Sequence, residues 1–99
     1  MESQHQKIKG YRDLSQEEID LMNEIKAKGV ELGSLVDKLF DHARSQIEKA
    51  GAHGDSTGDY SESERILAAE PAHWVATGAT QLQQGLMALT RAVAQPTTF

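Results

Sequence analysis

The chain has 99 residues, of which 38% are hydrophobic and 25% are charged, and its formal net charge is −5. This length predicts a single domain, residues 1–99, and the acidic balance argues against non-specific binding of DNA, RNA or anionic lipid. The absence of cysteine excludes disulfides and thiolate metal sites. No apolar run approaches the ~18 residues of a membrane-spanning helix, so a cytoplasmic protein without membrane contact is expected.

Residues 1–14 are predicted to form a short N-terminal arm. Its basic and aromatic residues are Lys7, Lys9, Tyr11 and Arg12. Ser15 can cap the first turn of a following helix, and Glu18, three residues later, completes the pattern of a capping box. The sequence therefore predicts that the first helix begins at Ser15.

Apolar residues in steps of three and four predict an amphipathic helix over residues 15–50. The stripe consists of Met22, Ile25, Gly29, Leu32, Val36, Phe40, Ala43 and Ile47. Such a helix would be roughly 54 Å long at 1.5 Å per residue. Gly29 and Gly33 interrupt the helix, and we expect them to mark the close approach of another helix.

Residues 51–60 are predicted to form a loop, because their glycines and small polar residues show no apolar period. A second helix is expected over residues 61–95, with Ser61 and Glu64 as its capping box. Pro71 is expected to kink this helix or to begin a new segment.

These stretches predict an all-α fold, a helical hairpin of two long antiparallel helices preceded by the arm. Both helices carry apolar residues on more than one face, and two helices cannot enclose that surface alone. Small residues in the second helix would let further helices approach: Gly78, Ala79, Gly85 and Ala88. We therefore expect the chain to assemble into a homo-oligomer.

No catalytic arrangement is visible, so we expect neither an enzyme nor a bound metal or cofactor. The four histidines, His5, His42, His53 and His73, are scattered without the spacing of one helix face. The adjacent carboxylates Glu17 and Glu18 are explained by their place in a first helical turn. No glycine motif of a nucleotide-binding loop is present.

The arm and the first helix offer a candidate site for a small anionic ligand. Tyr11 provides a flat face on which a purine can stack, an interaction worth ~1–3 kcal/mol per base. Lys26 and Lys28 supply charges for phosphate, and Arg12 offers a planar fork. The residues alone leave another interpretation open, in which Tyr11 packs on the helix and the lysines are solvated. Trp74 is expected to anchor a core or an interface.

Two long strings of the sequence resemble the phage anti-CBASS protein 2 family. They read KIKGYRDLSQEEIDLMNEIK in the arm and first helix, and AEPAHWVATGATQLQQGLMALTRAVAQP in the second helix. The resemblance implies a sponge that acts in the cytoplasm of the infected bacterium. Such a protein sequesters the cyclic oligonucleotide messengers of CBASS immunity without cleaving them.

The resemblance also implies a hexamer with two kinds of pocket. The first binds cyclic dinucleotides, such as 3',3'-cGAMP, between paired protomers, and it matches Tyr11 and Lys26, with Arg12 as supporting charge. The second binds cyclic trinucleotides where three protomers meet, and it matches Lys28 and His73. His73 stands where the resemblance implies a more basic residue, so binding there would depend on pH near the histidine pKa.

Two other functions remain open on the residues alone. One is a helical protein-binding module that inhibits a host defence protein directly, which recovery of a host protein partner without nucleotide would identify. The other is a structural helical oligomer, which would be indifferent to every cyclic nucleotide.

Overall fold

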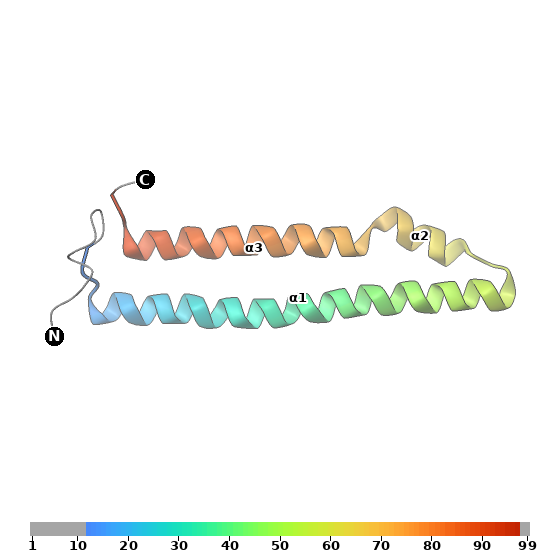
Figure 1. Cartoon of the computed structure of the whole chain (residues 1–99), viewed down its shortest axis with the longest axis horizontal. Helices are drawn as coiled ribbons and strands as arrows, with labels where there is room; N and C mark the ends of the chain where they lie inside the picture. The colour runs from blue at the N-terminus through green and yellow to red at the C-terminus, as the bar shows by residue number, and fades with distance from the viewer. Residues whose placement is uncertain (1–11, 98–99) are drawn as a thin grey trace. The chain divides into compact units, whose positions relative to one another are not determined.

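The computed structural model describes residues 12–97, which form three helices and no strand (Figure 1). Helix α1 spans Gln16–Thr57, α2 spans Ser61–Ala69 and α3 spans Pro71–Ala94. The described part of the chain is therefore all-helical, which confirms the all-α part of the predicted fold. Within residues 12–97, no helix is both long enough and apolar enough to cross a membrane.

The described residues form two compact units. The first unit contains residues 12–31 and 82–97, so it pairs the beginning of α1 with the end of α3. The second unit contains residues 32–81, which include the rest of α1, all of α2 and the beginning of α3. Each unit therefore contains its own helix packing and is described separately.

A capping box fixes the beginning of α1, as the sequence predicts. The amide of Ser15 donates to Glu18 Oε1 at 2.8 Å, and the amide of Glu18 donates to Ser15 Oγ at 3.2 Å. Glu17 and Glu18 also place negative charge at the positive end of the helix dipole. Ser15 is thus the cap, and Gln16 is the first helical residue.

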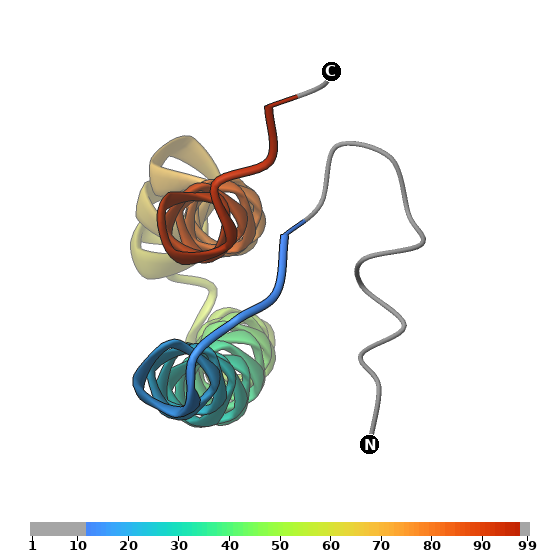
Figure 2. The ribbon, with the colours of Figure 1, turned by 90° about the vertical axis from the view of Figure 1, so that its left-hand side faces the viewer.

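Arg12 extends this cap into a link between α1 and α3. Its guanidinium forms an ion pair with the carboxylate of Glu18, with Nη1 at 3.1 Å from Oε1 and Nη2 bonded to Oε2. Nη2 also donates to the backbone oxygen of Val93, 2.8 Å away. The end-on view of Figure 2 shows the segment before α1 running towards the end of α3. The pKa of Glu18 falls to about 2, because of the hydrogen bond from Arg12 and then of that from the Ser15 amide.

The first unit depends on a close contact between α1 and α3. A Cβ added at Gly29 would lie 3.3 Å from Leu86 Cδ1, so Gly29 does mark the close approach of another helix. The same prediction is wrong for Gly33 within this chain, because an added Cβ there would have no atom within 4 Å. An added Cβ at Gly78 or at Gly85 would likewise have no atom within 4 Å.

The second unit contains the most deeply buried residues of the described chain. Ala43, Ala50 and Ile66 are at most 4% exposed, and Gly54 is also buried. The spacing of Ala43, Ala50 and Gly54 places these small residues on one face of α1. This face continues the apolar stripe predicted from Met22 onwards. At its end, however, the buried residue is Ala50, whereas Ile47, which the prediction included, is 44% exposed.

The loop predicted over residues 51–60 is wrong for most of its length, because α1 continues to Thr57. Packing compensates for the weak helix propensity of the glycines in this stretch. The ring of Tyr60 lies against Gly54, where an added Cβ would overlap the ring at 2.9 Å from Cγ. The hydroxyl of Tyr60 donates to Asp55 Oδ1 at 2.7 Å, which holds the ring in this place.

The connection from α1 to α2 is short and lacks the predicted capping box. Gly58 ends α1 with a left-handed φ of 78°, and its amide donates to the oxygen of Gly54 at 2.7 Å. Helix α2 begins at Ser61 itself, whose amide donates to Asp59 Oδ1 at 3.0 Å. Because Ser61 is already helical, it does not cap the helix together with Glu64, and α2 has no side-chain cap.

A break at Glu70 divides the helix predicted over residues 61–95 into α2 and α3. Glu70 is left-handed, with a φ of 51°, and its amide donates to the oxygen of Ile66 at 3.0 Å. Pro71 then occupies the first position of α3, where its missing N–H leaves no helical bond unmade. Of the two predicted roles for Pro71, the beginning of a new segment is confirmed.

Much apolar surface remains uncovered in both units. The most exposed large apolar residues are Met87 (71%), Leu67 (70%), Val30 (69%) and Trp74 (62%). Others with substantial exposure are Ile19, Leu21, Leu35, Leu39, Phe40, Ile47, Tyr60, Leu82 and Leu89. Trp74 is therefore not a core residue of this chain, and exposed apolar surface of this extent is typical of an interaction surface.

Substitutions at two glycines test the extension of α1. Gly54→Ala is expected to lower the free energy of unfolding by ~1–3 kcal/mol, since the added methyl overlaps the Tyr60 ring. Gly51→Ala is the matched control, because an added Cβ at Gly51 has no atom within 4 Å. That change should raise the free energy of unfolding by up to ~1 kcal/mol through helix propensity. Urea unfolding measures both, and equal effects of the two changes would contradict the packing of Tyr60 on Gly54.

Acid titration tests the link between Arg12 and Glu18. The pKa of Glu18 in the folded protein, about 2, lies below its usual 4.5, so its stabilising effect is complete above pH 4.5. The effect is lost as the pH falls towards 2, so the melting temperature of the wild type should fall more steeply in this window than that of Glu18→Gln. Glu17→Gln, which alters a carboxylate without a hydrogen-bond partner among the described residues, should behave like the wild type. Identical profiles for the wild type and Glu18→Gln would contradict the link.

Candidate functional site

Two grooves of the first unit lie against α1, and Ile25 and Leu86 line both of them. Lys26 lines one groove and Lys28 lines the other. A step of two residues turns an α-helix by ~200°, so the two lysine side chains leave α1 on nearly opposite sides. Each groove therefore receives one lysine, and we name the grooves after Lys26 and Lys28.

The Lys26 groove combines apolar walls with one unopposed positive charge. Its volume is about 530 Å³, within the ~300–1,000 Å³ of typical ligand pockets. Besides Lys26, its lining consists of Met22, Asn23, Ile25, Gly29, Val30, Leu86 and Thr90, none of which is acidic. Lys26 makes no ion pair or hydrogen bond with another described residue. The groove is therefore suited to a ligand that carries a phosphate beside a base or sugar.

Asn23 and Thr90 are polar residues of this groove that sequence reasoning missed. The carboxamide of Asn23 offers donors and an acceptor for a base edge or a phosphate. Thr90 donates its hydroxyl to the oxygen of Leu86 at 2.9 Å, so the lone pairs of its oxygen remain for a ligand. Asn23 could have been found from its position three residues before Lys26 on one helix face. Thr90 comes from α3 and becomes recognisable only once the two helices are paired.

The Lys28 groove is smaller, and its charge is balanced. Its volume is about 370 Å³, and its walls include Leu21, Leu89, Ala92 and Val93. Glu24 lines the same groove, and Lys28 Nζ lies 3.5 Å from Glu31 Oε2. These carboxylates partly cancel the charge of Lys28, so this groove attracts an anion less strongly than the Lys26 groove.

His73 lies in the first turn of α3 and belongs to the second unit, whereas Lys28 belongs to the first. The imidazole stands edge-on to the ring of Trp74, with the centroids 5.2 Å apart and the planes at 72°. The two residues matched to the trinucleotide pocket therefore do not share one packing unit of the chain.

Arg12 is the candidate residue whose surroundings differ most from the prediction. The sequence presents Arg12 as supporting charge for a ligand, but its guanidinium is bonded to Glu18 and to the backbone oxygen of Val93. The hydrogen bond from the guanidinium to Glu18 raises the pKa of Arg12. Tyr11, the predicted stacking residue, lies outside the described residues, as do Lys7 and Lys9.

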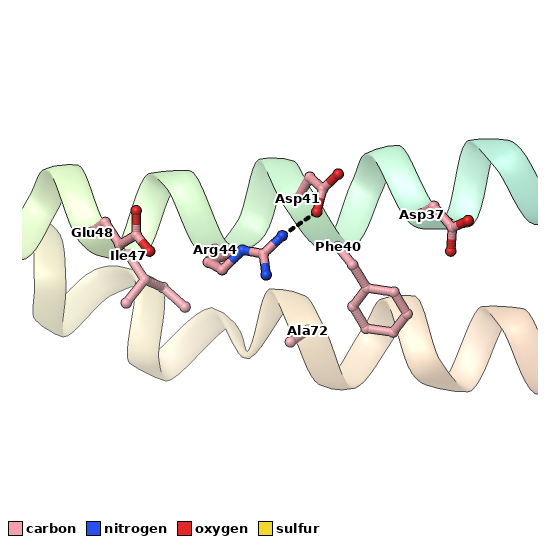
Figure 3. A pocket seen from close by; sticks show the side chains of 7 residues that line it. All are labelled: Asp37, Phe40, Asp41, Arg44, Ile47, Glu48 and Ala72. Atoms are coloured by element: carbon pink, nitrogen blue, oxygen red, sulfur yellow. Dashed lines mark hydrogen bonds and ion pairs between the residues drawn. The ribbon is translucent and has the colours of Figure 1, made fainter.

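A groove of the second unit has the wrong charge for a phosphate. Its volume is about 820 Å³, and it is lined by Asp37, Phe40, Asp41, Arg44, Ile47, Glu48 and Ala72 (Figure 3). Arg44 forms an ion pair with Asp41, which leaves two further carboxylates on the rim. Even so, no group of three acidic or histidine side chains within residues 12–97 is placed to hold a metal ion.

Comparison with known proteins identifies the same family that the two long strings of the sequence resemble. The model of the Acb2/Tad1 hairpin domain family matches residues 4–94. A protein named Anti-CBASS protein 2, from Pseudomonas phage JBD67, is 43% identical over 105 aligned residues, which cover 97% of each chain. The matched region includes the arm, the capping box and both lysine grooves. The chain therefore belongs to the Acb2/Tad1 hairpin domain family.

Proposed function

We propose that this protein counters bacterial CBASS immunity by binding and sequestering cyclic oligonucleotide messengers, above all cyclic dinucleotides, without degrading them. Its membership of the family and its similarity to Anti-CBASS protein 2 support the pathway. The observation that carries the ligand class is the Lys26 groove, where one unopposed lysine stands between apolar walls. Sequestration needs only tight binding and a stoichiometric amount of protein, so no catalytic group is required.

The chemistry of a cyclic dinucleotide fits a site built from two chains. The ligand carries two phosphates and two bases that are related by approximate two-fold symmetry. A two-fold interface would present one Lys26 to each phosphate and one Tyr11 to each base. Asn23 and Thr90 of the same groove supply polar contacts that distinguish base edges or hold the sugar. In this scheme the groove of one chain is half of a complete site.

Assembly into a hexamer, in the cytoplasm of the infected host, is part of the proposal. The support is the apolar surface that both units leave exposed, in particular Met87, Leu67, Val30 and Trp74. Gly33, Gly78 and Gly85 each have open space where a Cβ would stand, so another helix could approach the backbone closely there. Further copies of the chain would cover this surface.

Binding of cyclic trinucleotides is the weaker part of the proposal. It would use Lys28 and His73, contributed by different chains of the assembly. Glu24 and Glu31 reduce the positive charge around Lys28, so Lys28 would need a second ligand-binding group such as His73.

Alanine substitutions test the dinucleotide site. Tyr11→Ala and Lys26→Ala are each expected to weaken binding of 3',3'-cGAMP at least about fivefold, since base stacking and a charged hydrogen bond are each worth ~1–3 kcal/mol. Lys38→Ala, which removes an exposed lysine from another part of α1, should bind like the wild type. Isothermal titration calorimetry at one salt concentration gives the affinities. The ligand released from the wild type by heating should be intact.

Three results would contradict the proposal. Hydrolysed ligand would indicate an enzyme, and unchanged affinity in both alanine variants would place the site elsewhere. If the wild type binds no cyclic nucleotide but recovers a stoichiometric protein from host lysate, it would be a protein-binding inhibitor.

Sedimentation velocity tests the assembly. The expected species has about six times the 10.9 kDa mass of one chain, since the family resemblance implies a hexamer. In such an assembly further chains would cover the exposed apolar residues. Lys26→Ala should sediment in the same way as the wild type, since this substitution alters a groove and not the apolar surface. A monomer at micromolar concentration would contradict the proposed assembly.

A further inference from the structure

We propose that Arg12 is a positioning residue of the dinucleotide site and not a phosphate ligand: held by Glu18 and the Val93 carbonyl, it fixes the point at which the N-terminal arm leaves the helices. The role of the arm in ligand binding rests on the proposed function. The contacts of Arg12 lie entirely within the first unit of the chain.

The guanidinium of Arg12 joins three parts of that unit. Nη1 lies 3.1 Å from Glu18 Oε1, in the first turn of α1, and 3.4 Å from the backbone oxygen of Asp13. Nη2 bonds to Glu18 Oε2 and lies 2.8 Å from the oxygen of Val93, at the end of α3. Both terminal nitrogens are therefore engaged, and a phosphate could take neither without displacing a protein acceptor.

Each partner of Arg12 is itself held in place. The carboxylate of Glu18 also accepts the amide of Ser15 at 2.8 Å, so the capping box fixes its position on α1. The carbonyl of Val93 belongs to the last turn of α3, where backbone oxygens lack helical partners and where a cation is favourable. Arg12 thus provides the counter-charge of the Glu18 carboxylate and a hydrogen bond to the Val93 carbonyl, which has no helical partner.

This arrangement limits where the arm can begin. Arg12 is tied to both helices, so the chain that precedes it in the sequence is attached at a point that α1 and α3 fix. Lys26 lies eight residues after Glu18 on α1, which is ~12 Å along the helix axis. The same helix therefore positions Lys26 directly and positions the arm through Arg12. Restricting the arm before the ligand arrives lowers the conformational entropy that is lost on binding.

The two possible roles of Arg12 predict opposite effects of one substitution. Glutamine can replace Glu18 in a capping box, so Glu18→Gln keeps the acceptor for the Ser15 amide but loses the ion pair with Arg12. If Arg12 were a phosphate ligand, the loss of its competing carboxylate would free it and strengthen binding of the anion. If Arg12 positions the arm, the same substitution weakens binding, although it makes the protein less negative.

The experiment compares the affinity of 3',3'-cGAMP for the full-length wild type, Arg12→Gln, Glu18→Gln and the double variant. Each single substitution is expected to weaken binding about fivefold, the scale of an exposed but bidentate ion pair. The double variant should bind no more weakly than either single variant, because both substitutions break the same link. Glu17→Gln makes the same change of charge in the same helical turn and should not weaken binding. Helical content and oligomer mass at the temperature of the titration should be unchanged in all variants.

Two outcomes of the titration would overturn the proposal. Binding by Glu18→Gln that is as tight as that of Glu17→Gln, together with weak binding by Arg12→Gln, would make Arg12 a direct ligand. Additive losses in the double variant would show that Arg12 and Glu18 act independently of each other.

Hydrogen exchange in the ligand-free protein separates this proposal from the proposed function. Arg12→Gln should speed the exchange of the Ser15 amide at least about threefold relative to Glu17→Gln, because the carboxylate of Glu18 loses the cation that holds it. Unchanged exchange would overturn the link whatever the ligand. If Arg12→Gln speeds the exchange but the wild type binds no cyclic dinucleotide, the link between Arg12 and Glu18 stands. The proposed function is then wrong, and the positioning role of Arg12 is wrong with it.

Discussion

A pair of helices can bury only one seam of side chains, and this constraint governs both units of the chain. The seams are closed by small residues: Gly29 receives Leu86, and Gly54 receives the ring of Tyr60. Close approach of this kind excludes water from little area, so only Ala43, Ala50 and Ile66 among the hydrophobic residues of the described chain are almost fully buried. Side chains as large as Trp74 and Met87 remain exposed. A core this small stabilises a single chain only weakly, so association with further copies of the chain would add stability.

The seam of the first unit also separates the charges of Lys26 and Lys28, which line different grooves. Ile25 and Leu86 line both grooves, so Lys26 and Lys28 cannot act on one phosphate from the same side of α1. What distinguishes the grooves is their acidic neighbours: Glu24 lines the Lys28 groove, and the Lys26 groove has no carboxylate. A protein with a net charge of −5 can thus attract a small anion locally while its overall charge repels long polyanions.

Local sequence patterns predicted the beginning of α1 but not that of α2, and the features that depend on packing were not predictable. The capping box of Ser15 and Glu18 follows from residue types three positions apart. Pro71 predicted either a kink or the beginning of a new segment, and the second is observed. The extension of α1 through Gly54 was missed, because glycine spacing predicts a loop unless the ring of Tyr60 is known to pack there. Lys26 was proposed as a site residue from its charge and from the family resemblance, whereas Thr90 of the same groove is recognisable only once it is known which helices pair. The bond from Arg12 to Val93 joins residues 81 positions apart, which no local pattern reveals.

The contrast between Arg12 and Lys26 suggests how one small unit divides its cations between structure and binding. Arg12 has a planar fork with several donors, which suits it to satisfy a carboxylate and a backbone carbonyl at the same time. Lys26 is a compact charge on a flexible stem, and no described residue competes for it. Among the described residues, the Lys26 groove offers one free cation per chain, which under the proposed function favours a ligand with few charges. The remaining affinity for such a ligand would come from stacking and apolar contact. In the proposed assembly, two such sites facing each other would match the two phosphates of a cyclic dinucleotide. Because Arg12 is bonded to protein groups, it adds no free positive charge for a second phosphate. The proposed preference for a ligand with few charges therefore depends on the bonds of Arg12 as well as on the free ammonium of Lys26.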